Sequence, residues 1–374
     1  MLISLCVRLT KPSHPTPVCS RIRFCPPSPL LVSPRARLDG GMENPQLTFV
    51  TPTLLAGDRS LAQVVAHEIA HSWMGNLVTN ETWGHFWMNE GFTVWTERKI
   101  LTAISGGALA HLHAFLGFTA LKGDVARLQA AGKGAWTRLA LDTAGVDPDD
   151  SFSRVPYEKG FHFLWFLERT LGEAPFGRFV RECHVAGHRF GTVALPAWRA
   201  ALEAWCAAQP REEGLPAKLA TVDWELWTQG EGMPPGGEPP FDRSLVDEAE
   251  AEAARWGAGL SDAAVLDALG ARGTQRPYAA WPVLQQMVLL DMLVEKCAMP
   301  ATDADDDGSS GGATRAAWHA LLAKLDSAFE PALSSVAARN SELRFRFGML
   351  AAKSGAAAYF PAVVSLLEEQ GRMK

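Results

Sequence analysis

Long apolar runs are missing from this sequence, and so are runs of positive charge. No stretch of about 18 or more uncharged apolar residues occurs, so we expect no helix that spans a membrane. No long basic run occurs either, and the formal net charge is −6 at pH 7. Because domains that bind nucleic acid usually carry a basic face, we expect no nucleic-acid partner.

Cysteine is scarce and follows no pattern. The six cysteines form no CxxC pair; they are Cys6, Cys19, Cys25, Cys183, Cys206 and Cys297. Such a set favours free thiols in a reducing compartment over a disulfide framework.

The first 39 residues differ in composition from the rest of the chain. They are rich in proline, serine and arginine, and the first acidic residue is Asp39. This composition is typical of a disordered leader or an organellar transit peptide. Together with the cysteines, it leads us to expect a cytoplasmic protein, with an organellar location as the alternative if the leader is a transit peptide.

Composition divides the remaining 335 or so residues into two domains. The stretch "GMPPGGEPP" begins at Gly232 and predicts a linker, which we place at residues 233–241. Residues 40–232 form the first predicted domain. Residues 242–374 show helical spacing of apolar residues in several segments, with one helix expected over about 278–297. They predict a domain of stacked helices.

The first domain begins with strand-like sequence and continues with helices. "LTFVTPTLL" (47–55) is apolar and β-branched, which predicts a buried strand. Asp58 or Ser60 is expected to cap a helix that starts near Leu61. A second helix is expected over about 85–100.

The stretch "HEIAH" places metal-binding side chains on the first of these helices. Residues four apart lie on one face of a helix, so His67 and His71 present two imidazoles side by side. Glu68 lies beside them, close enough to hold a metal-bound water. A catalytic zinc site usually has three protein ligands, and Glu90 on the second helix is the natural third one. The pattern predicts one zinc ion per chain.

Glu97 lies seven residues after Glu90 and therefore on the same helical face. Its carboxylate can accept a hydrogen bond from a zinc-binding histidine, as outer carboxylates often do. It can equally be a surface acid that pairs with Arg98 or Lys99, and the spacing does not decide between the two.

Aromatic residues crowd the same region: Trp73, Trp83, Phe86 and Trp87. We expect most of them in the core and one or two along an apolar substrate pocket.

The order of two motifs resembles that of the gluzincin zinc aminopeptidases. HExxH is followed after 18 residues by Glu90, and "GGMENP" (40–45) is similar to their exopeptidase motif. "HSWMGNLVTN", "VPYEKGF" and "EQGRMK" resemble the leukotriene A(4) hydrolase and aminopeptidase B group of that family. The resemblance covers residues 40–374. It implies a mainly α fold with an α+β remnant, in which a thermolysin-like zinc catalytic domain precedes an armadillo-like helical repeat domain.

The resemblance also implies an activity and the residues that perform it. The chain would be a monomer that removes N-terminal residues from small peptides, with hydrolysis of a lipid epoxide as a further activity. His67, His71 and Glu90 would bind zinc. Glu68 would be the general base, and Tyr157 in "PYEKG" would stabilise the oxyanion.

Further positions would bind the substrate. Glu43 would hold the free α-amino group of a peptide within the motif formed by Gly40, Gly41, Met42, Glu43 and Asn44. Asp149 would direct water onto the epoxide substrate, and Arg372 and Lys374 would hold a substrate carboxylate. Judged singly, Asp149 is a surface acid, and Arg372 with Lys374 caps the negative end of a helix. Phe152 stands where animal hydrolases have a tyrosine.

The resemblance has gaps at both ends of the chain. Family members carry a β-rich domain before the exopeptidase motif and further helices after the end of this chain. We find no resemblance in residues 1–39, so we expect a truncated chain and favour a mispredicted start over true targeting. The alternative to an enzyme is then a non-catalytic chain whose helical repeats bind partners.

Overall fold

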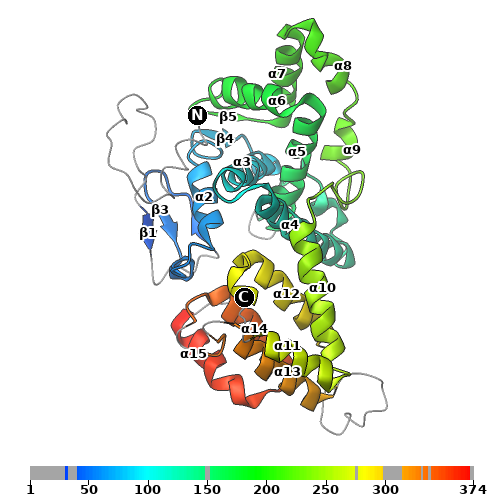
Figure 1. Cartoon of the computed structure of the whole chain (residues 1–374). Coiled ribbons are helices and arrows are strands. Elements are labelled where there is room, and N and C mark those ends of the chain that lie inside the picture. Colours follow the sequence, from blue (N-terminus) through cyan, green and yellow to red (C-terminus); the bar gives the residue numbers. More distant parts are fainter. Residues whose placement is uncertain are drawn as a thin grey trace, which may run out of the picture. The chain divides into compact units, whose positions relative to one another are not determined.

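The computed structural model describes residues 30–32, 40–147, 152–273, 277–297, 314–329, 332–335 and 338–370. These residues form two compact units (Figure 1). Unit 1 consists of the described residues within Met1–Leu31, Gly41–Phe49 and Gln63–Phe241. Unit 2 consists of those within Val32–Gly40, Val50–Ala62 and Asp242–Lys374.

Strands are few and short in the described residues. Strands β1 (Leu30–Val32), β2 (Gly41–Met42) and β3 (Thr48–Val50) form one sheet in the order β1-β3-β2. Strand β4 (Val78–Asn80) pairs in parallel with β5 (Gly191–Val193). The strand expected over 47–55 is present as β3, but it is shorter. Proline has no amide hydrogen to donate to a sheet, and Pro52 begins the 3-10 helix η1 (Pro52–Leu54) instead.

Unit 1 is otherwise helical. Its α-helices are α2 (Ala62–Ala70), α3 (Trp87–Ser105), α4 (Gly107–Ala130), α5 (Gly160–Leu171), α6 (Glu173–Phe179), α7 (Leu195–Ala208), α8 (Leu215–Leu219) and α9 (Trp224–Thr228). Three 3-10 helices, η2 (Trp83–His85), η3 (Gly134–Thr137) and η7 (Arg211–Glu213), and two π-helices, η5 (Val155–Lys159) and η6 (Val180–Val185), join them. Both helices expected near the HExxH motif are confirmed.

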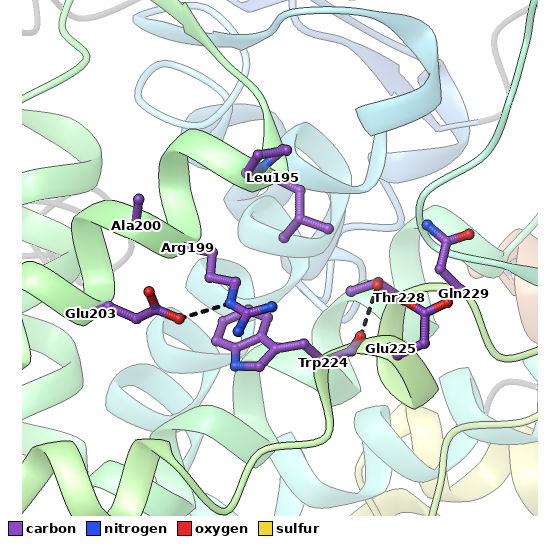
Figure 2. A pocket seen from close by; sticks show the side chains of 9 residues that line it. Leu195, Arg199, Ala200, Glu203, Trp224, Glu225, Thr228 and Gln229 are labelled. Carbon is purple, nitrogen blue, oxygen red and sulfur yellow. Dashed lines mark hydrogen bonds and ion pairs between the residues drawn. The ribbon is translucent and has the colours of Figure 1, made fainter.

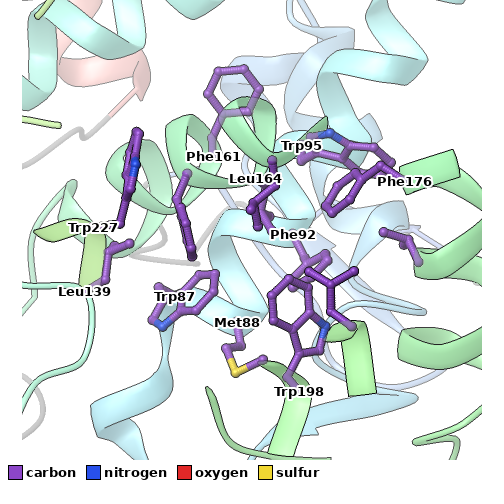
Figure 3. Packing of buried hydrophobic residues seen from close by; sticks show 14 of the residues in the cluster. Trp87, Met88, Phe92, Trp95, Leu139, Phe161, Leu164, Phe176, Trp198 and Trp227 are labelled. Carbon is purple, nitrogen blue, oxygen red and sulfur yellow. The ribbon is translucent and has the colours of Figure 1, made fainter. Parts of the chain in front are cut away.

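Helix α3 is the central element of unit 1, because it packs against both α4 and α5. Its first two turns bury Trp87 and Phe92 completely, and these rings lie against Trp198 of α7 (Figure 3). Phe163 of α5 also contacts Trp87. Each such ring removes a large apolar area from water. The aromatic cluster therefore fixes the rotation of α3 about its own axis.

Unit 2 confirms the predicted helical domain. Its helices are α10 (Ser244–Gly259), α11 (Ala263–Gly273), η8 (Pro277–Ala280), α12 (Val283–Lys296), α13 (Arg315–Ala328), α14 (Ser341–Lys353), η10 (Ala357–Tyr359) and α15 (Phe360–Gln370). Helices pack on their next-but-one neighbours, α10 on α12, α12 on α14 and α11 on α13, as in stacked helical repeats. The helix expected over about 278–297 is present as α12, but it begins later, because Pro282 separates it from the 3-10 helix η8. Among the described helices, none is long and apolar enough to cross a membrane.

The segment between β3 and α2 groups with unit 2, although we placed it in the catalytic domain. The side-chain amide of Asn340, at the start of α14, donates to Asp58 Oδ2 at 3.1 Å and to Ser60 Oγ at 2.8 Å. Asp58 in turn accepts a hydrogen bond from the Ser60 amide at 2.9 Å. These bonds occupy both residues that were expected to cap α2, and they tie the segment to α14.

A buried histidine makes the stability of unit 1 depend on pH. His184 is 1% exposed, and its ring stacks on Phe92 with centroids 4.0 Å apart. Neither ring nitrogen has a hydrogen-bond partner in the part of the chain that the structure describes. Burial, helped by His188, lowers the pKa of His184 to about 3. Between pH 6.5 and about 3, His184 therefore binds a proton in the unfolded chain but not in the folded chain. The folded state loses about 1.4 kcal/mol for each pH unit in this window.

We expect His184→Phe to keep the stacking and to remove this acid sensitivity. Urea unfolding at pH 7 and pH 5 should show a smaller difference in unfolding free energy than in the wild type. His319→Gln, which changes a partly exposed histidine of unit 2, is the control and should leave the difference unchanged. An equal difference in His184→Phe and wild type would show that His184 does not cause the acid sensitivity.

Candidate active site

Three metal-binding atoms converge from two helices. His67 lies on α2, and His71 follows it in a continued helical turn, with its amide donating to the His67 carbonyl at 3.2 Å. The two Nε2 atoms face each other at 3.1 Å. Glu90 comes from the first turn of α3, and its Oε2 lies 3.4 Å from each Nε2. The histidine pair and the distant glutamate therefore meet as the spacing predicts.

This arrangement fits a tetrahedral zinc ion. With metal–ligand bonds of about 2.0–2.1 Å, tetrahedral ligand atoms lie roughly 3.3 Å apart. The observed separations of 3.1, 3.4 and 3.4 Å match that value. Glu90 Oε2 is buried and takes part in no hydrogen bond, as expected of an atom reserved for a metal. Burial opposes its ionisation, but His71 and His67 lower the pKa of Glu90 to about 2.

Hydrogen bonds behind the histidines orient their rings. His67 Nδ1 lies 3.0 Å from Glu97 Oε2, and His71 Nδ1 lies 2.9 Å from the carbonyl oxygen of Met74. Both partners are acceptors, so each ring carries its proton on Nδ1 and offers the Nε2 lone pair to a metal. Glu97 is buried and contacts His67, so it is not a surface acid; its support of a zinc ligand stays a prediction.

A second acidic group lies beside the metal-binding atoms. Carboxylate oxygens of Glu43 and Glu68 and a ring nitrogen of His71 all lie within 4.8 Å of one another. Burial raises the pKa of Glu68 to about 7, and its Oε2 accepts no hydrogen bond. Gly41 approaches this carboxylate so closely that a side chain at position 41 would collide with it. The Asn76 amide donates to the Glu43 carbonyl at 2.7 Å and holds the motif in place.

The remaining motif residues lie around Glu43. Gly41 and Met42 form β2, the Gly40 carbonyl accepts from the Thr51 amide at 3.1 Å, and that of Asn44 accepts from the Leu47 amide at 3.0 Å. The structure thus brings the exopeptidase motif next to the zinc-binding helix.

Tyr157 faces the same centre from the π-helix η5. Its ring lies parallel to that of His67, with centroids 6.2 Å apart, and makes edge contacts with Phe86 and Phe152. Burial, with the carboxylates of Glu90 and Glu43, raises the pKa of Tyr157. Its hydroxyl therefore stays protonated and can donate a hydrogen bond at neutral pH.

Glycine allows η5 to approach α3. Gly91 follows Glu90, Gly160 follows η5, and the two backbones touch: a Cβ on Gly91 would lie 2.8 Å from the Gly160 Cα. This contact sets the distance between Tyr157 and the metal ligands.

The structure buries two of the four aromatic residues. Trp73 and Trp87 are buried in the core. Trp83 is 56% exposed and packs against Phe86, which in turn contacts Tyr157. This aromatic edge can line an apolar pocket.

Three predicted residues lie outside the described part of the chain, namely Asp149, Arg372 and Lys374. Their roles stay predictions. The sequence analysis missed two residues that hold parts of the site by hydrogen bonds, Asn76 and Thr93. Thr93 donates to the Met74 carbonyl at 2.9 Å, beside His71 Nδ1. Their partners are distant in sequence, so no spacing pattern could have revealed them.

A separate surface pocket of about 440 Å³ lies between α7 and α9 (Figure 2). In its wall, Arg199 pairs with Glu203 at 2.8 Å and stacks over Trp224. None of the metal-binding residues lines it.

We expect Glu97→Ala to weaken zinc binding by about 10- to 100-fold, because His67 loses the acceptor that orients it. Zinc content in metal-buffered solutions measures the effect. Glu173→Ala, which removes an exposed acid paired with Lys99, is the control and should retain wild-type zinc affinity. Wild-type affinity in Glu97→Ala would show that the Glu97–His67 contact is irrelevant to the metal.

Comparison with known proteins supports this interpretation. Residues 24–211, half of the chain, match the peptidase family M1 domain. Leucine aminopeptidase 2 of Sclerotinia sclerotiorum is 42% identical over 61% of this chain and 36% of its own length. Leucine aminopeptidase 2 of Neurospora crassa is 34% identical over 92% of this chain and 46% of its own length. The chain thus spans about a third to a half of these relatives. The match begins at residue 24, so the expected lack of resemblance in residues 1–39 is wrong for residues 24–39.

The fold is shared with solved structures. Leukotriene A4 hydrolase from Saccharomyces cerevisiae superposes with a TM-score of 0.77 at 30% identity, covering 92% of this chain and 52% of that one. A yeast LTA4 hydrolase in complex with bestatin superposes with a TM-score of 0.74. The predicted fold, a thermolysin-like zinc domain followed by a helical repeat domain, is confirmed. With its HExxH helix, distal Glu90 and matching fold, this chain belongs to peptidase family M1.

Proposed function

We propose that this chain is a zinc aminopeptidase that removes N-terminal residues from small peptides. The observation that carries the proposal is the position of Glu43, whose carboxylate lies within 4.8 Å of Glu68 and His71. A carboxylate beside the metal site can bind the α-ammonium group of a peptide by a charge-assisted hydrogen bond. The Glu43 carboxylate thereby favours cleavage of the peptide bond next to the N-terminus over cleavage of internal peptide bonds.

The chain's own residues divide the chemistry of peptide hydrolysis. Zinc, when bound by His67, His71 and Glu90, supplies a Lewis acid that polarises the scissile carbonyl. The buried Glu68 carboxylate takes a proton from water and passes it to the leaving amine. The protonated hydroxyl of Tyr157 donates a hydrogen bond to the developing oxyanion.

Hydrolysis of a lipid epoxide is a second candidate activity. The aromatic edge formed by Trp83, Phe86 and Phe152 beside Tyr157 offers an apolar surface to such a substrate. A relative from Botryotinia fuckeliana with 42% identity is named leukotriene A-4 hydrolase homolog. Asp149, Arg372 and Lys374 would serve this activity.

The alternative of a non-catalytic binding module is not favoured. A scaffold has no physical need for a buried carboxylate oxygen without a hydrogen bond at Glu90 or for two histidines with oriented rings. The cytoplasmic location and the monomeric state are further proposals, which rest on the sequence and which cell fractionation and gel filtration would test.

The proposal is tested by hydrolysis of an alanyl or arginyl anilide. We expect cleavage of the free-amine substrate alone, with loss of cleavage on chelation and recovery with zinc. Glu68→Gln should lower turnover by about 10²- to 10⁴-fold, since it removes the general base, while the zinc content stays at one per chain.

Two comparisons make this test specific. An N-acetylated anilide lacks the ammonium group that Glu43 binds, so it should not be cleaved. Glu81→Gln changes an exposed acid and should leave turnover unchanged. If Glu68→Gln turns over at the wild-type rate with zinc bound, Glu68 is not the base.

A further inference from the structure

We propose that Lys159 is a positioning residue, which holds the π-helical turn η5 so that Tyr157 points at the metal centre. Its side chain touches neither a substrate site nor a metal ligand. It acts through the backbone of η5, two residues after Tyr157.

The surroundings of Lys159 are those of a structural clamp. The side chain is 0% exposed. Its ammonium donates three hydrogen bonds, to the carbonyls of Thr137 at 2.8 Å, Gly230 at 2.8 Å and Gly232 at 2.9 Å. An ammonium has three donors, so every donor is satisfied. Since all three donors are used within the protein, this lysine offers none to an outside ligand.

Among the described residues, no carboxylate forms a hydrogen bond with this ammonium. Glu231 is the nearby acid, and it pairs with Arg138 at 2.7 Å. Burial accordingly lowers the pKa of Lys159 to about 8, so the ammonium persists at neutral pH. Burying a charge without an ionic partner is costly. The three carbonyls must therefore be held rigidly enough to offset that cost.

The acceptors come from two segments that are also joined to each other. Thr137 ends η3, and its hydroxyl accepts from the Gly232 amide at 2.7 Å. Leu139 and Ala140 both donate to the Thr228 carbonyl, at 3.1 and 3.0 Å. Lys159 thus anchors η5 to two loops that are joined to each other by hydrogen bonds.

The preceding residue anchors the opposite side of the turn. Glu158 accepts two hydrogen bonds of 2.9 Å from Arg98 of α3, and both side chains are buried. Arg98 also lies 4.0 Å over the ring of Phe161. Glu158 therefore ties η5 to the helix that carries Glu90, while Lys159 ties it to the loops.

These two anchors matter because η5 is a π-helix. A single π-helical turn is rare and is found mostly where function requires it. Tyr157 is half-buried, and its ring contacts those of His67, Phe86 and Phe152. The backbone of η5 sets where this ring starts, so the position of the ring depends on the two anchors of the turn. Without the three hydrogen bonds of Lys159, the π-helical turn can change its conformation and move the Tyr157 phenol away from His67.

The kinetic test is a double-mutant cycle between Lys159→Met and Tyr157→Phe, and it rests on the proposed aminopeptidase activity. We expect Lys159→Met to lower kcat by about tenfold or more, with KM within about threefold, because small misplacements of a reacting group are costly. In the Tyr157→Phe background the same change should cost less than about twofold. Equal losses in both backgrounds, or a wild-type kcat, would overturn the proposal.

A second readout needs no turnover. The chain has three tyrosines, so 3-fluorotyrosine labelling gives three fluorine NMR signals, and Tyr157→Phe identifies one of them. Lys159→Met should move or broaden the Tyr157 signal alone. Lys133→Met is the matched control, an exposed lysine that precedes the same η3 turn and stacks over Trp136. It should leave all three signals and kcat unchanged.

The two readouts separate the two proposals. If the wild type cleaves no substrate, the aminopeptidase proposal fails for this chain, while the fluorine signal still decides the role of Lys159. An unchanged Tyr157 signal in Lys159→Met would overturn the positioning role. If Lys159→Met does not fold, Thr137→Val carries the same test, since it removes the hydroxyl that holds Gly232. A displaced Tyr157 signal in that variant supports the proposal, and an unchanged one overturns it.

Discussion

The packing of α3 against the end of α2 is the constraint on which the active site depends. Two metal-binding nitrogens come from one helix and the third donor, Glu90, comes from the other, so a small rotation of α3 would separate them. Apolar packing prevents that rotation, because Trp87 and Phe92 on α3 are fully buried against Trp198 and its neighbours (Figure 3). The hydrophobic effect is non-directional, yet here the burial of apolar rings on α3 fixes the direction of the Glu90 side chain.

Helix α3 also carries more charge than a central helix usually tolerates. Glu90, Glu97 and Arg98 are all buried. Each has a partner from another element: the two histidines for Glu90, His67 for Glu97 and Glu158 for Arg98. Breaking one buried pair costs about 3–5 kcal/mol, because the remaining charge is left without compensation. These pairs add little net stability, but they make alternative registers of α3 unfavourable.

The charges also connect the parts of the site to one another. Glu97 supports a zinc-binding histidine, and the next residue, Arg98, holds the turn that carries Tyr157. Close contact between Gly91 and Gly160 sets how near that turn can come. The elements that carry His67, Glu90 and Tyr157 are thus all held by contacts with α3. This explains how the three side chains keep a fixed geometry.

The sequence by itself determined the features that depend on local geometry. The helical period places His67 beside His71, and the motif spacing pointed to Glu68 and Glu90, whereas Glu43 and Tyr157 came from the resemblance to a family motif. Only the tertiary structure decided the burial of Glu97, the clamp around Lys159 and the hydrogen bonds between Asn340 and the segment at Asp58. The reason is physical: these contacts join residues tens to hundreds of positions apart, where no periodicity links them. Their strength also depends on burial, which a linear pattern does not record.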